Sequence, residues 1–199
     1  MNALASPARQ TADERRQEIV AAAMAEFAAH GLSGANVQAI ARRVGVSQPY
    51  VFQLFGTKKD LFLAVVHEGF TRTRVAFEDA ASRQRAGQYE NCNSVLMAMG
   101  LRYKELLHDR TLLLVQLQAY AACDDADVRD VVRHEWHELH RFVAEASGAS
   151  PHEVFEFFSI GMLLNVGAAI QLEGEPETWT LDAFAAVTLE TQGERPSMS

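Results

Sequence analysis

The 199-residue sequence contains only two cysteines, Cys92 and Cys123, which are too few for a disulfide framework in a chain of this length. We interpret both as thiols in a reducing compartment, with redox sensing by the pair left open as an alternative. The first ten residues lack the apolar stretch of a signal peptide. The longest near-continuous apolar run, 160–170, includes Asn165 and is too short to span a bilayer. These absences predict a cytoplasmic protein that has no membrane partner.

Signals for β-strands are also nearly absent. No segment sustains an alternation of apolar and polar residues, and no Asn-Gly or Asp-Gly pair marks a hairpin turn. Apolar residues instead recur at helical spacing through most of the chain, with helix stop signals between the segments. The sequence therefore predicts an all-α protein of about nine helices.

Motifs that carry catalysis are missing as well. The sequence has no Gly-rich phosphate loop, no G-x-S-x-G and no H-E-x-x-H. His134, His137 and His140 invite a metal interpretation, but six helical residues turn through roughly 600°, so the outer two point about 120° apart. We expect no metal, no cofactor and no enzymatic activity, and we interpret these histidines as part of a hydrated helix face.

The net charge of −8 argues against a protein that coats nucleic acid without specificity. The charge is unevenly distributed along the chain. Residues 1–60 contain seven Lys and Arg against five acidic residues, whereas residues 61–199 contain eleven against twenty-one. This asymmetry suggests an N-terminal end that binds nucleic acid and a separate acidic body.

The stretch 36–61 has the pattern of a helix-turn-helix followed by the start of another helix. Asn36 is a good N-cap, Gly45 can take the positive φ that a tight turn requires, and Ser47 stands where the next N-cap belongs. Pro49 falls in the first turn of the second helix, where a missing N–H does no harm. The second helix of such a motif can enter the major groove of DNA.

The first residues of that second helix are the expected readers of base edges. Gln48 can pair with adenine through two hydrogen bonds, and Pro49 or the ring of Tyr50 can lie against a thymine methyl. We expect Tyr50 to be exposed, because other apolar residues already supply the inner face of the helix. Lys58, at the start of the following helix, is expected to hold a phosphate.

Caps and stop signals also divide the rest of the chain. Expected helices cover 12–30, 37–44, 48–54, 58–82, 89–108, 110–123, the segment from the acidic run 124–127 to Gly148, 151–172 and 179–190, with a loop at 83–88 and a tail at 191–199. The helix over 151–172 is apolar on both faces, so we expect one face to meet a second subunit, with small residues such as Ala168 at the contact. We expect a DNA-binding domain over 1–56 and a second domain over 57–199.

Over residues 11–66 the sequence resembles the TetR family of bacterial transcriptional repressors. The family pattern is F-x-x-x-G, then a T-x-x-x-I-A helix, then G-V-S-x-x-x-L-Y-x-H-F, and then a small residue and K-x-x-L. The residues that carry the resemblance are Phe27, Gly31, Asn36, Ile40, Ala41, Gly45, Val46, Ser47, the run 48–55, Thr57, Lys58 and Leu61. Many positions agree in order and spacing, whereas the remainder of the chain resembles the family only in length and helix layout.

The resemblance implies a set of DNA contacts. Phe52 stands where the family often has Tyr, and Leu54 stands where it often has His, and both family residues commonly touch phosphates. Fewer backbone contacts are therefore implied here, with more weight on Lys58 and on helix N-termini. The residues expected at the DNA are Asn36, Gln38, Ser47, Gln48, Pro49, Tyr50, Phe52, Gln53, Thr57 and Lys58.

The resemblance also implies a homodimer, formed by the helices expected over 151–172 and 179–190. This dimer is expected to bind an operator and to leave the DNA when a small effector binds. Apolar and aromatic residues of the body are candidates for the effector pocket, with plain core packing as the alternative for each. They are Met97, Leu101, Leu113, Leu117, Tyr120, Trp136, Phe155, Phe158 and Met162, with Gln116, Gln118 and Asn165 as polar contacts. Two other functions stay open at this point: a dimeric DNA binder without an effector, and a helical-bundle enzyme with an accidental motif.

Overall fold

The computed structural model describes residues 11–89 and 92–172, and these residues form eight α-helices and no strand. The bounds are α1 Ala12–Gly34, α2 Val37–Val44, α3 Gln48–Phe55, α4 Lys58–Arg85, α5 Val95–Leu106, α6 Arg110–Ala121, α7 Ala126–Ser147 and α8 Pro151–Ala169. The expected all-α class is confirmed. The helix expected over 179–190 and the tail over 191–199 lie outside the described residues.

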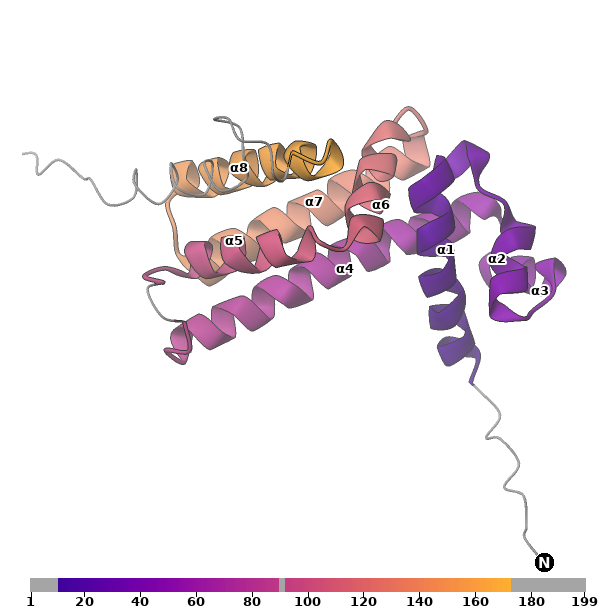
Figure 1. The fold of residues 1–199 in the computed structure, drawn as a ribbon, viewed down its shortest axis with the longest axis horizontal. Coiled ribbons are helices and arrows are strands. Elements are labelled where there is room, and N and C mark those ends of the chain that lie inside the picture. The colour runs from indigo at the N-terminus through magenta and orange to yellow at the C-terminus, as the bar shows by residue number, and fades with distance from the viewer. Residues whose placement is uncertain (1–10, 90–91, 173–199) are drawn as a thin grey trace, which may run out of the picture.

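The first three helices gather at one end of the molecule (Figure 1). α1 begins at a reciprocal capping box between Thr11 and Glu14 and is interrupted at Gly31, where the backbone is not helical (φ 64°, ψ −176°). One further turn follows to Gly34. The sequence predicted this interruption as the end of the helix, because glycine tolerates a backbone that other residues resist.

The long helix α4 connects this end to the body (Figure 1). A second reciprocal capping box, between Thr57 and Asp60, begins it. Its 28 residues extend over about 42 Å, at 1.5 Å per residue. The helix continues three residues beyond the expected end at Ser82, and the turn is made by Gly87 with φ 69°. The polar residues assigned to a loop are good helix formers, which explains the difference.

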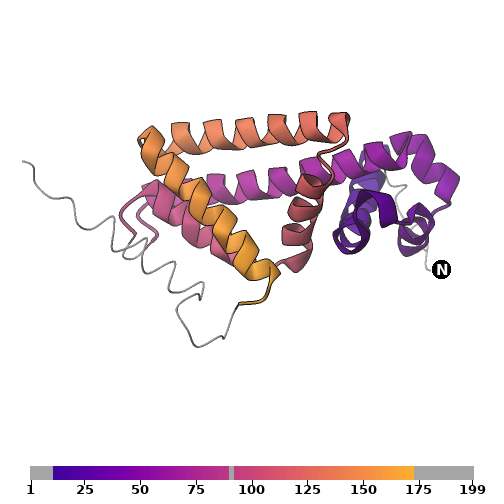
Figure 2. The same cartoon turned by 90° about the horizontal axis from the view of Figure 1, so that it is seen from above.

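The body consists of α5 to α8 packed around the far part of α4. α7 runs alongside α4, and α8 crosses the bundle obliquely (Figure 2). α5 begins at Val95 and not at 89 as expected, because Ser94 caps it by accepting a hydrogen bond from the Met97 amide at 3.1 Å. α7 ends at Gly148 and α8 begins at the Ser150–Glu153 capping box, both as expected.

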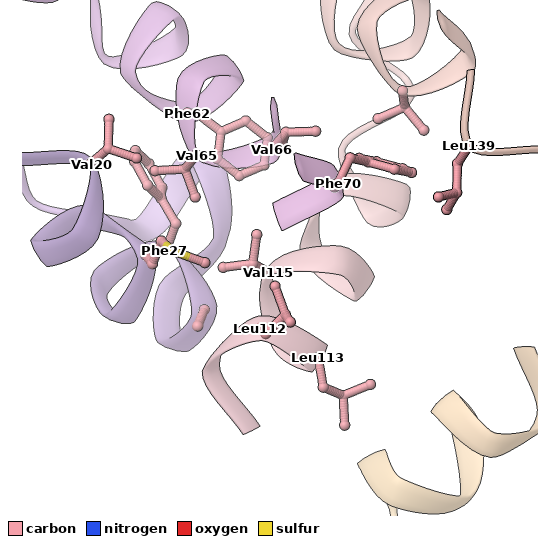
Figure 3. Close-up of a cluster of buried hydrophobic side chains, with 14 of the residues drawn as sticks. Val20, Phe27, Phe62, Val65, Val66, Phe70, Leu112, Leu113, Val115 and Leu139 are labelled. Carbon is pink, nitrogen blue, oxygen red and sulfur yellow. The ribbon is translucent and has the colours of Figure 1, made fainter. Parts of the chain in front are cut away.

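One hydrophobic core runs through the N-terminal helices and the body. Phe27 of α1 and Phe62 of α4 meet edge to face with ring centroids 5.0 Å apart. Figure 3 shows this contact continuing past Val65 towards Leu112 and Val115 of α6. The division into domains at residue 56 stays a prediction, and the core is continuous across that point.

A search of the helices in the described ranges found none that is both long and apolar enough to cross a membrane.

Candidate nucleic-acid interface

The start of α2 is fixed from two sides. Asn36 Oδ1 accepts hydrogen bonds from the amides of Gln38 at 2.9 Å and Ala39 at 3.2 Å, as expected of an N-cap. The amide of Asn36 itself donates to Glu26 Oε1 at 3.0 Å, and Glu26 is only 7% exposed. The sequence did not indicate this role for Glu26, because the contact joins residues in different helices. With α2 held in this way, Gln38 is presented on an exposed surface.

The turn and the start of α3 follow the expected chemistry. Gly45 adopts the left-handed conformation (φ 74°), and Ser47 Oγ accepts the Tyr50 amide at 3.3 Å. Pro49 and Gln53 are exposed on α3, and Gln48 is half-buried. Pro49 and Gln53 are thus the exposed residues of the candidate recognition helix.

Three aromatic and apolar residues of α3 lie deeper than expected. Tyr50, predicted to be exposed, is half-buried and packs against the core. Phe52 and Leu54 are also half-buried and pack there. The prediction for Tyr50 was wrong because an eight-residue helix wedged against α2 and α4 has little surface free of neighbours. Phe52 was expected only as a DNA contact, but it also packs against the core.

Arg16 of α1 holds the opposite end of α3. Its guanidinium donates to the backbone oxygen of Leu54 at 2.6 Å and lies 4.2 Å from the centroid of the Phe55 ring. A cation at a helix C-terminus satisfies a free carbonyl and matches the helix dipole. The sequence analysis did not predict this contact of Arg16, since no local pattern reveals which helix end a distant arginine reaches.

Lys58 makes intramolecular contacts that the sequence did not predict. Its Nζ donates to the backbone oxygens of Ser33 at 2.9 Å and Ala35 at 3.4 Å, and so closes the loop between α1 and α2. An ammonium has three hydrogens, so one remains for another acceptor. Thr57, also expected at the DNA, is exposed, and its hydroxyl donates to Asp60 Oδ2 at 2.6 Å within the capping box.

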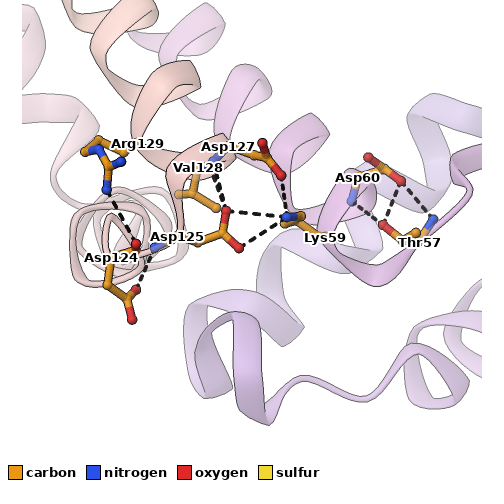
Figure 4. A network of polar contacts seen from close by, with 8 residues as sticks. All are labelled: Thr57, Lys59, Asp60, Asp124, Asp125, Asp127, Val128 and Arg129. Atoms are coloured by element: carbon orange, nitrogen blue, oxygen red, sulfur yellow. Dashed lines mark hydrogen bonds and ion pairs between the residues drawn. The ribbon is translucent and has the colours of Figure 1, made fainter.

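Lys59 connects α4 to the first turn of α7 (Figure 4). Its Nζ lies 3.2 Å from Asp125 Oδ2 and also pairs with Asp127. The hydrogen bond to Asp127 is the main reason why the pKa of Lys59 is raised. The pKa of Asp125 is lowered, first by the hydrogen bond from the Val128 amide and then by Lys59. The acidic run before α7 thus neutralises the lysine next to Lys58.

The other basic residues of this end differ in whether their side chains already have partners within the protein. Arg15 pairs with Glu18 at 2.7 Å, and Arg43 donates to the backbone oxygen of Ala22 at 2.9 Å. Arg42 is exposed, and its side chain has no hydrogen-bond or ion-pair partner among the described residues. Few cationic groups in the described part of this end are therefore unengaged.

A cavity of about 160 Å³ lies in the body between α4, α5, α6, α7 and α8. Of the residues expected in an effector pocket, those that line the cavity are Met97, Leu101, Trp136, Phe158 and Met162, together with the polar residues Gln116 and Asn165. Leu113, Leu117, Tyr120 and Phe155 do not line it, and neither does Gln118. A helix that is apolar all round carries apolar residues on the faces that point away from the cavity as well. Leu113 is therefore buried in the core, and Phe155 is 68% exposed.

Histidines of α7 do not gather into a metal site. His134, His137 and His140 are exposed, and the ring of His140 stacks on Phe158 at 5.2 Å. No cluster of three or more His, Cys, Asp or Glu suitable for a metal occurs in the ranges that the structure describes.

The geometry defines a helix-turn-helix protein with a helical body. Residues 19–65 match the family model described as "Bacterial regulatory proteins, tetR family". The match covers the helix-turn-helix, over the same part of the chain in which the sequence pattern predicted a resemblance to the TetR family.

Curated relatives are similar over this same region. The transcriptional repressor AcnR of Corynebacterium diphtheriae is 43% identical over 58 residues, which are 29% of this chain and 30% of AcnR. The transcriptional activator FasR of Mycolicibacterium smegmatis is 43% identical over 54 residues, 27% of this chain and 25% of FasR. The chain thus spans less than a third of the length of these relatives.

Solved structures share the fold over nearly the whole chain. A TetR-family regulator structure from Mesorhizobium loti superposes with a TM-score of 0.68 at 19% identity, covering 92% of this chain and 96% of that one. A regulator from Saccharomonospora viridis, solved in complex with choline, has a TM-score of 0.63 at 17% identity and covers 92% and 97% of the two chains. At these identities the likeness is one of fold.

Proposed function

We propose that this protein is a sequence-specific DNA-binding transcriptional repressor, held on a pseudo-palindromic operator and released by a small apolar or aromatic effector. The observation that carries the proposal is the support of α3, which is anchored by Ser47 at one end and Arg16 at the other while Pro49 and Gln53 stay exposed. A recognition helix needs such a rigid support, because base readout depends on placing a few side chains accurately. A regulator of this kind acts in the bacterial cytoplasm, where the chromosome lies.

Base contacts would come from α3 and the start of α2. Gln48, Pro49 and Gln53 are the readers that the exposure of α3 supports, and Gln38 stands beside them at the start of α2. The exposed N-termini of these helices and the remaining hydrogen of Lys58 are suited to phosphates. Few free cations imply a modest salt dependence, since each neutralised phosphate adds to the salt slope.

The proposed homodimer uses the outer face of α8. Four apolar side chains recur along this helix and stay exposed: Phe155, Leu163, Val166 and Ile170, between 40% and 68% accessible. An exposed apolar stripe of this kind, here interrupted by Ser159, is typical of a protein–protein interface. Ala168 does not belong to it, because it is 9% exposed and packs inside its own chain, so the expectation that placed Ala168 at the contact is corrected. The segment expected over 179–190 would add to the interface.

The effector would act through α6 and α4. One face of α6 lines the cavity with Leu112, Val115 and Gln116, while the helix as a whole packs on α1. A ligand that shifts α6 therefore has a direct mechanical route to the helix-turn-helix. In such a population shift the effector favours a conformation in which the two recognition helices lose the spacing that the operator requires.

The test starts from the full-length protein and a random DNA library. Successive selection should enrich a two-fold symmetric sequence with half-sites about one helical turn apart. Affinity for the enriched duplex should exceed affinity for a scrambled duplex by at least about 10³ at physiological salt. Equal affinity for the two duplexes would refute the proposal.

The direction of regulation is tested separately, since AcnR is named a repressor and FasR an activator. A reporter gene behind the selected operator should be more active when the protein is absent. Lower reporter activity without the protein would identify an activator and contradict repression.

A further inference from the structure

Four of the polar residues that line the cavity are uncharged. They supply the hydroxyls of Thr73 and Tyr103 and the amides of Gln116 and Asn165. Thr73 is already engaged, because its hydroxyl donates to the backbone oxygen of Gly69 at 3.1 Å. Asn165 is only 1% exposed, so it is the most deeply buried polar side chain of this set. A buried amide in an apolar cavity is a specific feature that packing alone does not require.

Three charged residues also belong to the lining: Lys104 on α5, and Glu153 and Glu156 in the first part of α8. Glu153 belongs to the capping box of α8 and accepts hydrogen bonds from the amide and hydroxyl of Ser150. Glu156 is exposed and pairs with His152 at 3.5 Å. Lys104 is half-buried on α5. Both carboxylates thus have partners at the start of α8.

Tyr103 and Asn165 leave hydrogen-bonding capacity unused. The single hydroxyl hydrogen of Tyr103 faces two oxygens, Asn165 Oδ1 at 2.7 Å and Gln116 Oε1 at 3.2 Å, so one of the two acceptors lacks a full bond. Asn165 Nδ2 donates to Met162 Sδ at 3.7 Å, a weak acceptor, although an amide has two hydrogens to give. Burial raises the pKa of Tyr103 to about 12, which keeps this hydroxyl neutral. The site therefore offers both an acceptor and a donor to a partner.

A chain of aromatic rings borders the same cavity. Phe77 packs on Tyr103 at 5.8 Å and on Phe157 at 5.6 Å between centroids. Phe157 packs edge to face on Phe158 at 5.4 Å, and Phe158 packs on Trp136 at 5.0 Å. These contacts offer ring edges and faces to an aromatic guest, which gains by the same geometry.

The size of the cavity suits a guest with a single ring. Its volume is about 160 Å³, and an apolar cavity of roughly 150 Å³ is known to bind benzene. Larger drug-like ligands need cavities of roughly 300 Å³ or more. An uncompensated charge is costly beside the buried amide of Asn165, so a neutral guest is favoured there.

We propose that the cavity binds a neutral single-ring alcohol or phenol, with its ring against Phe77, Phe157 and Phe158 and its hydroxyl beside Tyr103 and Asn165. There the guest hydroxyl would accept from Asn165 Nδ2 and donate to the Tyr103 oxygen. A hydroxyl both donates and accepts, which matches the two unused capacities. This inference rests on the proposed function in that the ligand would be the effector, but binding itself does not require DNA.

The experiment measures binding to the DNA-free full-length protein by calorimetry, with phenol as the probe. Toluene, benzoate and choline serve as comparison ligands that lack the hydroxyl, add a negative charge or add a positive charge. Phenol should bind about tenfold more tightly than toluene, as expected for one neutral hydrogen bond. Benzoate or choline binding as tightly as phenol would overturn the proposal, and so would equal binding of phenol and toluene or no phenol binding at millimolar concentration.

Variants locate the site. Asn165→Leu removes the amide at similar volume, so toluene should still bind while the preference for phenol disappears. Tyr103→Phe tests the same preference with a smaller change and decides the question if Asn165→Leu does not fold. Gly161→Leu, at a cavity-lining position, should abolish binding of both ligands, whereas Ala86→Leu, at an exposed position after α4, should not. A retained phenol preference in both Asn165→Leu and Tyr103→Phe would refute the assignment.

A parallel assay separates this inference from the proposed function. Phenol that binds the protein but does not release a selected operator supports the ligand class and refutes effector release. Failure to select any operator refutes the proposed function, while the calorimetric result still decides the ligand class.

Discussion

The side-chain amide of Gln118 in α6 lies against the backbone of Gly31 in α1, at the point where α1 is interrupted. A Cβ atom on Gly31 would lie 2.6 Å from Gln118 Oε1. The body therefore touches the helix-turn-helix end through a glycine whose φ of 64° and ψ of −176° are reached by few other residues. This contact connects the helix that borders the cavity to the helix that supports the DNA-binding face.

Replacement of Gly31 by alanine should destabilise the protein. The backbone conformation is strained for any residue with a Cβ atom, and we expect the free energy of unfolding to fall by about 1–3 kcal/mol. Urea denaturation measures the change. Gly34→Ala is the matched control, because Gly34 has an ordinary backbone and its Cβ would lie 3.4 Å from His30 Cβ. Equal effects of the two substitutions would show that Gly31 is not required for its conformation.

Lys58→Met should weaken the binding of operator and unrelated DNA to a similar extent. If the remaining hydrogen of Lys58 holds a phosphate, the slope of log affinity against log salt should become shallower by about 0.9. Lys59→Met is the control, since Lys59 is occupied by Asp125 and Asp127 and should leave the slope unchanged. An unchanged slope in Lys58→Met would restrict Lys58 to closing the loop at Ser33 and Ala35.

Gln48→Ala should reduce sequence discrimination and leave non-specific binding intact. A glutamine that makes two hydrogen bonds to adenine contributes about 1–3 kcal/mol of discrimination, so the preference for operator over scrambled DNA should fall at least about fivefold. Fluorescence anisotropy with both duplexes measures the ratio. Parallel loss on both duplexes would contradict a reading role for Gln48.

Val166→Glu should give monomers in light scattering while helix content is preserved. Val166 is 49% exposed within the apolar stripe of α8, so a carboxylate there faces the proposed partner and not the core. Ala168→Glu should instead unfold the protein, because Ala168 is buried in its own chain. A Val166→Glu protein that stays dimeric would exclude this stripe from the interface.

Stability should decrease at alkaline pH in a manner that depends on Tyr103. Burial raises the pKa of this phenol to about 12, above its ordinary value of 10.0. The unfolded chain releases the proton first, so this contribution is complete below pH 10 and is lost as the pH rises through about 12. Between pH 9 and pH 11 the loss should be about 1 kcal/mol of unfolding free energy. Urea titrations should show that Tyr103→Phe does not lose this part of its unfolding free energy. An identical pH dependence of stability in the wild-type protein and in Tyr103→Phe would contradict the assignment.

Helix caps were the most informative local signals. Asn36 and Ser47 were the expected N-caps of the helix-turn-helix, and each accepts a backbone hydrogen bond at a helix start. A cap acts over three residues, so its effect depends little on the rest of the chain. The helix expected from residue 89 begins only at Val95, because Ser94 is its N-cap.

Side-chain partners were less accessible to sequence reasoning. Lys58 and Lys59 are neighbours in sequence, yet one closes the loop between α1 and α2 and the other binds the first turn of α7. Of the two candidate polar contacts in α6, Gln116 lines the cavity while Gln118 contacts Gly31. Two residues of spacing rotate a side chain by about 200° around a helix, and only the neighbouring helices decide what each side meets.

The helical class, the order of the helices and the helix-turn-helix followed from the amino-acid sequence, because caps, turns and periodicity act over a few residues. The position of Tyr50 against the core, the arginine at the end of α3 and the cavity around Asn165 were decided by tertiary packing. These features depend on which helices pack together across the chain, and no local pattern specifies that contact. The sequence thus predicted a DNA-reading element, and the fold determined how that element is supported and what the body can bind.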